Sequence, residues 1–142
     1  MRENKLIDIE EIKKLKARYF RLMDQKLWEE WGEVFTEDAT LQYGPNDGEV
    51  FEGRKGIVEG LSKILADAIT VHHGHMPEIE MIDANSATGT WAMFDYVEMP
   101  GLTLKGYGHY EEEYVKEAGR WRIKNLRLTR LRVDMIGTGG GS

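Results

Sequence analysis

Apolar residues recur every three to four positions through the first part of the chain, and this spacing is typical of an amphipathic helix. The repeat runs through Ile9, Ile12, Lys16, Tyr19, Phe20, Met23 and Leu27. Asp8 precedes the run and Glu11 follows three residues later, so we expect a capping box at the start of this helix. A second, short helix is expected to carry Leu27, Trp28, Trp31 and Phe35, and a third is expected over residues 56–67.

From Thr70 onward the apolar spacing changes to every second residue, which is typical of strands. The expected strands cover residues 70–82, 87–98, 103–115 and 121–133, after a shorter strand at 41–43 and a turn at 44–48. Strands longer than about ten residues suit a strongly curved antiparallel sheet. Helices followed by such strands indicate an α+β fold, here a cone with an open mouth. We expect one domain over residues 1–136 and a disordered glycine-rich tail at 137–142.

The composition excludes several classes of function. The 142 residues carry a net charge of −6, which argues against a nucleic-acid or anionic-membrane partner because phosphate binding needs clustered cations. No stretch approaches the roughly 20 apolar residues of a membrane span, and the N-terminus lacks the apolar segment of a signal peptide. The absence of cysteine excludes disulfides, thiolate metal sites and a cysteine nucleophile. A cytoplasmic protein is the expectation that remains.

Two charged residues share strand faces with apolar side chains. Asp95 alternates with Trp91 and Met93 along one expected strand. Arg130 follows Leu128 in the same way along the last strand. A buried carboxylate is costly unless it is paired, and an inward arginine is its natural counter-charge. The pattern predicts an ion pair that opens onto a pocket, but a bulge that turns Asp95 outward or a purely structural ion pair would fit it as well.

Tyr19 and Asp24 lie near the end of the first helix. Tyr19 falls within the apolar stripe, and Asp24 lies at its edge. A carboxylate near a helix C-terminus opposes the helix dipole, so another contact must favour Asp24 there. The alternative is a solvent-exposed aspartate that caps the following turn.

Three of the four histidines lie within four residues, at His72, His73 and His75. Alternation along a strand places His73 and His75 on one face and His72 on the other. A metal site built from His73, His75 and Glu80 would loosely resemble that of cupin barrels. Those barrels are almost entirely strand, whereas this chain opens with helices, so we expect no metal.

General acid–base catalysis uses the same residues without a metal. An imidazole is a base suited to neutral pH, and a carboxylate such as Asp24 or Asp95 would hold its ring in one tautomer. No serine nucleophile motif of the Gly-x-Ser-x-Gly kind is present. We therefore expect an acid–base site that needs no cofactor.

The residues that stand out lie in segments with a family resemblance. Residues 9–24, 27–28, 71–79 and 87–95 resemble, in this order, the SnoaL-like branch of the NTF2-like superfamily. Within that branch the chain is most similar to bile-acid 7α-dehydratases. The similarity runs from about residue 7 to residue 134 and implies a cone of curved sheet covered by helices.

The resemblance also implies a role for each candidate residue. His72 stands where the family has its catalytic base, and Asp24 where it has the carboxylate partner of that base. Tyr19 matches a tyrosine that hydrogen-bonds the substrate. Asp95 matches a second catalytic acid, and Arg130 matches an arginine of the pocket.

These expectations combine into one functional hypothesis, a cofactor-independent lyase of the dehydratase type. Its substrate would be small, apolar and carbonyl-containing, with steroid-like molecules among the candidates. An isomerase or cyclase of polyketide- or terpenoid-like substrates would use the same pocket, and the superfamily also contains ligand-binding domains without catalysis. The resemblance implies a homo-oligomer, either a trimer or a dimer.

Overall fold

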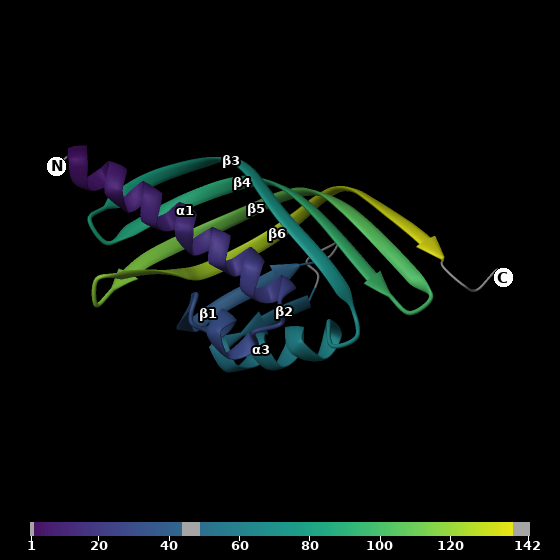
Figure 1. Cartoon of the computed structure of the whole chain (residues 1–142). Coiled ribbons are helices and arrows are strands. Elements are labelled where there is room, and N and C mark those ends of the chain that lie inside the picture. Colours follow the sequence, from purple (N-terminus) through teal and green to yellow (C-terminus); the bar gives the residue numbers. More distant parts are fainter. Residues whose placement is uncertain (1, 44–48, 138–142) are drawn as a thin grey trace.

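The computed structural model describes residues 2–43 and 49–137, in which the strands build one curved sheet beside the helices (Figure 1). In chain order the elements are α1 (Arg2–Asp24), α2 (Trp28–Gly32), β1 (Phe35–Tyr43), β2 (Glu49–Glu52), α3 (Gly53–Ile64), β3 (Ile69–Asp83), β4 (Ser86–Met99), β5 (Leu102–Glu117) and β6 (Arg120–Gly137). The predicted α+β class is confirmed.

The sheet has the strand order β2-β1-β6-β5-β4-β3. The long strands β3 to β6 form the expected antiparallel meander, whereas β1 runs parallel to β6. α1 crosses one face of the long strands, and α3 lies beside β1 and β2 (Figure 1). The two helices therefore pack against different parts of the sheet, α1 against β3 and α3 against β1 and β2.

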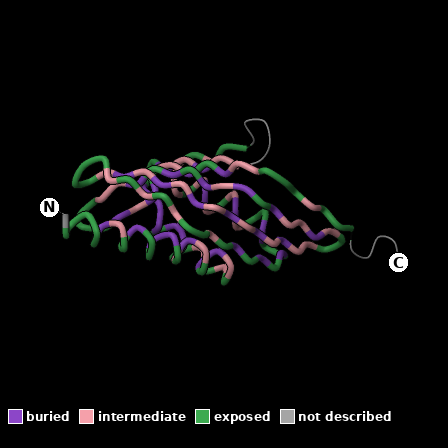
Figure 2. The backbone as a smooth tube through the Cα atoms, turned by 90° about the horizontal axis from the view of Figure 1, so that it is seen from above, coloured by how far each residue is buried: buried purple, intermediate pink, exposed green. Residues whose placement is uncertain are grey.

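Most of the predicted stripe of α1 faces the sheet and is buried or half-buried, whereas Leu27 lies beyond the end of α1 and is exposed. Ile12, Leu15 and Tyr19 are each at most 4% exposed. On β4, buried and half-buried residues alternate along nearly the whole strand, because successive side chains point to opposite faces. Seen from above, the buried part of α1 lies toward the strands and its exposed turns face outward (Figure 2).

The start of the first helix differs from the prediction. α1 begins at Arg2, so Asp8 lies inside the helix and caps nothing. Its carboxylate is buried and accepts hydrogen bonds from Trp121 Nε1 at 2.9 Å and Lys116 Nζ at 3.2 Å. The capping-box prediction was wrong. Asp8 instead joins α1 to Lys116 and Trp121, which lie more than a hundred residues later in the β5–β6 hairpin, and the local sequence does not reveal these partners.

The region between the first helix and the long strands also differs. Phe35 is fully buried in β1 and lies outside α2, which ends at Gly32. β1 extends well before the expected residues 41–43 because it pairs with both β6 and the unpredicted β2. α3 begins and ends three residues earlier than expected, and its first residue, Gly53, turns the chain with a φ of 78°.

The remaining boundaries are close to those expected from the alternation. Each of β3 to β6 extends beyond its predicted range by one or more residues at both ends. The predicted turn at 44–48 and residues 138–142 of the predicted tail lie outside the described residues. Gly137, assigned to the tail, is the last residue of β6.

Candidate active site

A cavity opens between the end of α1, α3 and the inner face of the sheet. Its volume is about 170 Å³, and it is open to the outside at its mouth. Most of its lining is apolar and includes Met23, Leu61, Val97, Leu104 and Leu128. Among the predicted site residues, Tyr19, His72, Asp95 and Arg130 line the same cavity.

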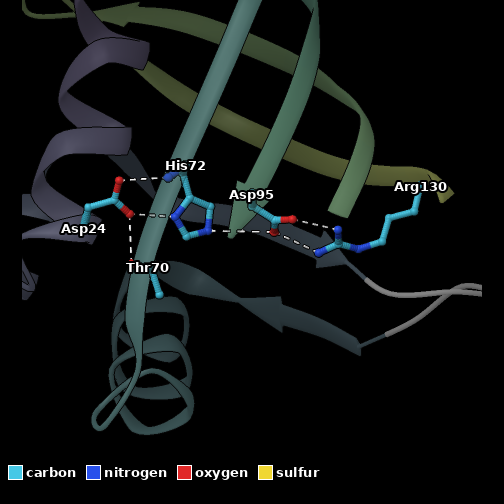
Figure 3. A network of polar contacts seen from close by, with 5 residues as sticks. All are labelled: Asp24, Thr70, His72, Asp95 and Arg130. Carbon is cyan, nitrogen blue, oxygen red and sulfur yellow. Dashed lines mark hydrogen bonds and ion pairs between the residues drawn. The ribbon is translucent and has the colours of Figure 1, made fainter. Parts of the chain in front are cut away.

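His72 projects inward from β3 and is held by Asp24 at the end of α1 (Figure 3). Its Nδ1 lies 2.7 Å from Asp24 Oδ1, and its backbone N–H donates to Asp24 Oδ2 at 2.9 Å. The Thr70 hydroxyl donates to Asp24 Oδ1 at 2.9 Å. Because a carboxylate only accepts, the Nδ1 contact requires a proton on Nδ1. In the neutral ring Nε2 is then unprotonated, which is the arrangement of a general base.

Asp95 and Arg130 lie on the other side of the imidazole (Figure 3). Arg130 Nη1 and Nη2 donate to the two carboxylate oxygens of Asp95, each at 2.9 Å. His72 Nε2 lies 4.0 Å from Asp95 Oδ2. The predicted ion pair is therefore present and faces the cavity, and the alternative of an outward-turned Asp95 is wrong.

Gly106 of β5 makes this ion pair possible. It lies opposite Asp95 in the sheet, and the Arg130 guanidinium crosses β5 above it. A Cβ at this position would lie 1.6 Å from Arg130 Nη1 and 2.2 Å from Asp95 Oδ1. Any other side chain would displace the pair.

Replacing Gly106 by alanine is expected to separate Asp95 from Arg130 and to lower the free energy of unfolding by about 1–3 kcal/mol. Urea unfolding of the variant measures this. Gly56→Ala is a matched control, because a Cβ on Gly56 in α3 meets nothing within 4 Å. That variant should be more stable by about 0.5–1 kcal/mol, since alanine suits a helix better than glycine. Equal stability of Gly106→Ala and the parent chain would contradict the steric argument.

Tyr19 is accompanied by a second tyrosine, Tyr110 of β5, which the sequence did not single out. Both line the cavity, and their rings meet edge to face with centroids 5.9 Å apart. Burial raises the pKa of both hydroxyls well above the ordinary value, and a hydrogen bond from Tyr110 opposes the increase at Tyr19. Both are neutral at physiological pH and act there as hydrogen-bond donors.

The buried tyrosines predict a loss of stability at high pH. Burial is the main cause that raises the pKa of Tyr19, Tyr110 and Tyr114. In the unfolded chain they ionise near pH 10, so above that pH the unfolded state gives up protons that the folded state retains. The three tyrosines contribute fully to the free energy of unfolding below pH 10. Above pH 10 each tyrosine should lower that free energy by up to about 1.4 kcal/mol for every pH unit.

Urea unfolding at a series of pH values above 10.5 tests this. Burial lowers the pKa of Lys16 from 10.5 to about 8, so its effect runs in the opposite direction and ends near pH 10.5. The Tyr110→Phe variant should show a shallower loss than the parent chain. A stability that stays constant from pH 10.5 to about 12 would contradict the prediction.

The other histidines lie outside this site. His73 and His75 are exposed on the outer face of the sheet, with ring centroids 5.7 Å apart, as the alternation indicated. His109 lies on the same face, beside Ala92 of β4. Within residues 2–43 and 49–137, no group of three or more metal-ligating side chains is suitably placed for an ion.

None of the helices in the described part of the chain is long and apolar enough to cross a membrane.

Comparison with known proteins places the chain in a family. The model of the SnoaL-like domain matches residues 4–127, so the chain belongs to the SnoaL-like domain family, as its motifs indicated. The narrower resemblance to bile-acid 7α-dehydratases stays a prediction.

Individual relatives agree with this assignment. "Probable cyclase FGR4" of Gibberella zeae is 25% identical in an alignment of 135 positions that covers 84% of this chain and 89% of the relative. The crystal structure of a "Putative Scytalone Dehydratase" from Novosphingobium aromaticivorans superimposes with a TM-score of 0.85 at 23% identity, covering 94% of this chain and 91% of the other. A hexachlorocyclohexane dehydrochlorinase, LinA type 2, gives a TM-score of 0.86 at 15% identity, with 98% and 95% covered. At these identities the two structures show a shared fold.

Proposed function

We propose that the protein is a cofactor-independent lyase that eliminates a leaving group from a small apolar ketone. The observation that carries this proposal is the fixed imidazole of His72. Asp24 holds its Nδ1, while His72 belongs to the lining of a mostly apolar cavity. A base placed in this way accelerates proton abstraction by about 10²–10⁴.

The proposed reaction uses His72 twice. Nε2 takes the proton from the carbon next to the carbonyl, and the electron pair of the C–H bond moves to the carbonyl oxygen to give an enolate. Tyr19 donates a hydrogen bond to that oxygen. The enolate then reforms the carbonyl and expels hydroxide from the neighbouring carbon as a C=C bond forms. The hydroxide takes the proton from the His72 imidazolium and leaves as water, so the base is restored.

Asp95 and Arg130 take part in this proposal as a pair. Both Asp95 oxygens accept hydrogen bonds from the Arg130 guanidinium. The pair would assist departure of the leaving group or position the substrate. Because the two charges neutralise each other, the pair offers little attraction to an anionic substrate.

The names of the relatives support two reaction classes. A dehydratase and a dehydrochlorinase are named for eliminations, and both share the fold. The curated relative is named a cyclase, which favours an isomerase or cyclase with the same base as the second candidate. The third candidate function is that of a ligand-binding domain without catalysis, for which we expect no proton transfer.

Deuterium exchange separates these candidates. The chain would be incubated in heavy water with 2-tetralone and with 3-hydroxycyclohexanone, and mass spectrometry would follow both substrates. We expect deuterium next to the carbonyl of 2-tetralone and loss of water from the hydroxyketone, both reduced in Asp24→Asn. Deuterium uptake without loss of water would favour the isomerase or cyclase. Binding without any uptake would contradict a catalytic base.

We also expect a homo-oligomer, formed through the outer face of the sheet. An aromatic row of His73, Phe94 and Tyr107 crosses that face, with neighbouring centroids 6.1 Å and 5.5 Å apart. Exposed aromatic side chains are enriched at protein interfaces. Sedimentation velocity should show a dimer or trimer, and Phe94→Lys should shift it toward the monomer. A monomer at micromolar concentration would contradict this expectation.

A further inference from the structure

A lysine that the proposed reaction does not use is buried directly behind the two tyrosines of the cavity. Lys16 lies on the buried stripe of α1, and its side chain is 0% exposed. Its Nζ lies 3.7 Å from the ring centroid of Tyr19 and 3.7 Å from that of Tyr110. A third ring, that of Phe20, lies 5.0 Å away. The ammonium group is thus enclosed by aromatic rings, two of which line the cavity.

Glu112 of β5 holds this ammonium group in place. Its Oε2 accepts a short hydrogen bond from Lys16 Nζ, and its Oε1 accepts from the Tyr114 hydroxyl. The Tyr114 hydroxyl in turn accepts from Trp91 Nε1 at 2.9 Å. Both carboxylate oxygens are therefore engaged, and the position of the cation is determined by a network that spans α1, β4 and β5.

Stability alone does not account for such a pair. Two charges taken out of water are commonly no more stabilising than apolar residues of the same volume, because desolvation offsets their attraction. A fixed cation against an aromatic ring, however, draws electron density from that ring. In a phenol this strengthens the hydroxyl as a hydrogen-bond donor, and most strongly toward an acceptor that carries negative charge.

We propose that the Tyr19 hydroxyl donates to a substrate oxygen that becomes negatively charged, that Tyr110 supports it by donating to the Tyr19 hydroxyl, and that Lys16 is a positioning residue that polarises both rings from behind. This inference deepens the proposed function and rests on it for the identity of the oxygen, the carbonyl oxygen that becomes the enolate. The ligand class is an uncharged ketone with its oxygen against the tyrosines. Arg130 is occupied by Asp95, so among the described residues that line the cavity no free arginine or lysine is available for a carboxylate.

The test uses 4-nitrophenol, whose neutral and anionic forms absorb differently. It mimics a ketone and its enolate without requiring turnover. At neutral pH the parent chain should bind the phenolate in preference to the phenol. Removing both charges with Lys16→Met plus Glu112→Gln should lower that preference by about 3- to 30-fold. In a chain that also carries Tyr19→Phe and Tyr110→Phe, the same change should have no further effect, because the cation acts through the two hydroxyls.

A second acid–lysine pair provides the matched control. Asp8 and Lys116 also join α1 to β5, at 3.2 Å, but neither residue lines the cavity. Asp8→Asn plus Lys116→Met should alter stability and leave the phenolate preference unchanged. A parent chain that does not prefer the phenolate, or an equal loss in both double variants, would overturn the inference.

The His72→Ala variant separates this inference from the proposed lyase reaction. That variant lacks the proposed base but keeps both tyrosines, so it should retain the phenolate preference. If neither the parent chain nor any variant turns over a substrate, but the phenolate preference still depends on Lys16, the donor site is supported and the lyase proposal fails. If the preference disappears with His72 and survives the loss of Lys16, the donor site fails.

A measurement on the parent chain covers the case in which a variant does not fold. The pKa of Lys16 is lowered by burial to about 8, against the opposing effect of Glu112. The ionisable groups that face Lys16 are Tyr19 on α1 and Glu112 and Tyr110 on β5, with Tyr114 behind Glu112. With carbon-13 at tyrosine Cζ, the NMR signals of Tyr19 and Tyr110 should shift together with a midpoint near pH 8. Signals that do not move between pH 7 and about 9 would overturn the polarising role.

Discussion

Replacing His72 by alanine is expected to lower the rate of proton exchange from 2-tetralone by about 10²–10⁴, because the proposed base, which Asp24 fixes, is lost. Mass spectrometry of the ketone in heavy water measures the rate. Circular dichroism of the variant should match that of the parent chain. The imidazole borders a cavity, and its removal enlarges that cavity without disturbing the packed core.

His73→Ala is the matched control for this experiment. His73 is the next residue of β3, but it is exposed on the outer face of the sheet and contacts Phe94. Its removal should leave the exchange rate within about two-fold, as expected for a surface substitution. Full activity in the His72 variant, or equal losses in both, would remove His72 from the reaction.

The largest expected effect on stability comes from Lys16→Met. This change leaves Glu112 buried and charged with no cation beside it, and both side chains of the parent pair are 0% exposed. Breaking a buried ion pair by removing one partner costs about 3–5 kcal/mol. Urea unfolding at neutral pH should show this loss as a lower midpoint with an unchanged slope.

The Lys16→Met plus Glu112→Gln chain should recover much of that stability, because no buried charge remains and glutamine still accepts from Tyr114. A double variant as unstable as Lys16→Met alone would show that the loss comes from packing and not from the unpaired charge.

The fold followed from the sequence where the periodicity was long and regular. The stripe of α1 and the alternation of β3 to β6 each extend over many residues, so the pattern identified both type and approximate range. The segment around Phe35 was misassigned because its pattern is short. β1 also depends on a parallel partner, β6, that lies more than eighty residues later. Pairing at that distance leaves no local signal.

The residues of the candidate site also differ in whether the sequence alone could reveal them. Asp95 and Arg130 were found because a charged residue on an apolar strand face must have a partner, and each supplies the other. Lys16 and Glu112 carry a similar signal, a charged residue on an apolar face, but the sequence does not pair them. Lys16 lies in the apolar stripe of α1, and Glu112 shares a strand face with Tyr110, but they are 96 residues apart. Only the packing of α1 on β5 brings them together.

The contact between Asp24 and the backbone of His72 has a consequence for the chain as a whole. β3 is the last strand of the sheet, and the His72 N–H that Asp24 accepts points away from β4, toward the free edge. Unpaired N–H groups along a free edge are templates for strands of other molecules. Asp24 thus blocks part of that edge with the same carboxylate that holds the His72 imidazole. A change of Asp24 would therefore alter both the proposed reaction and the exposure of the sheet edge to other chains.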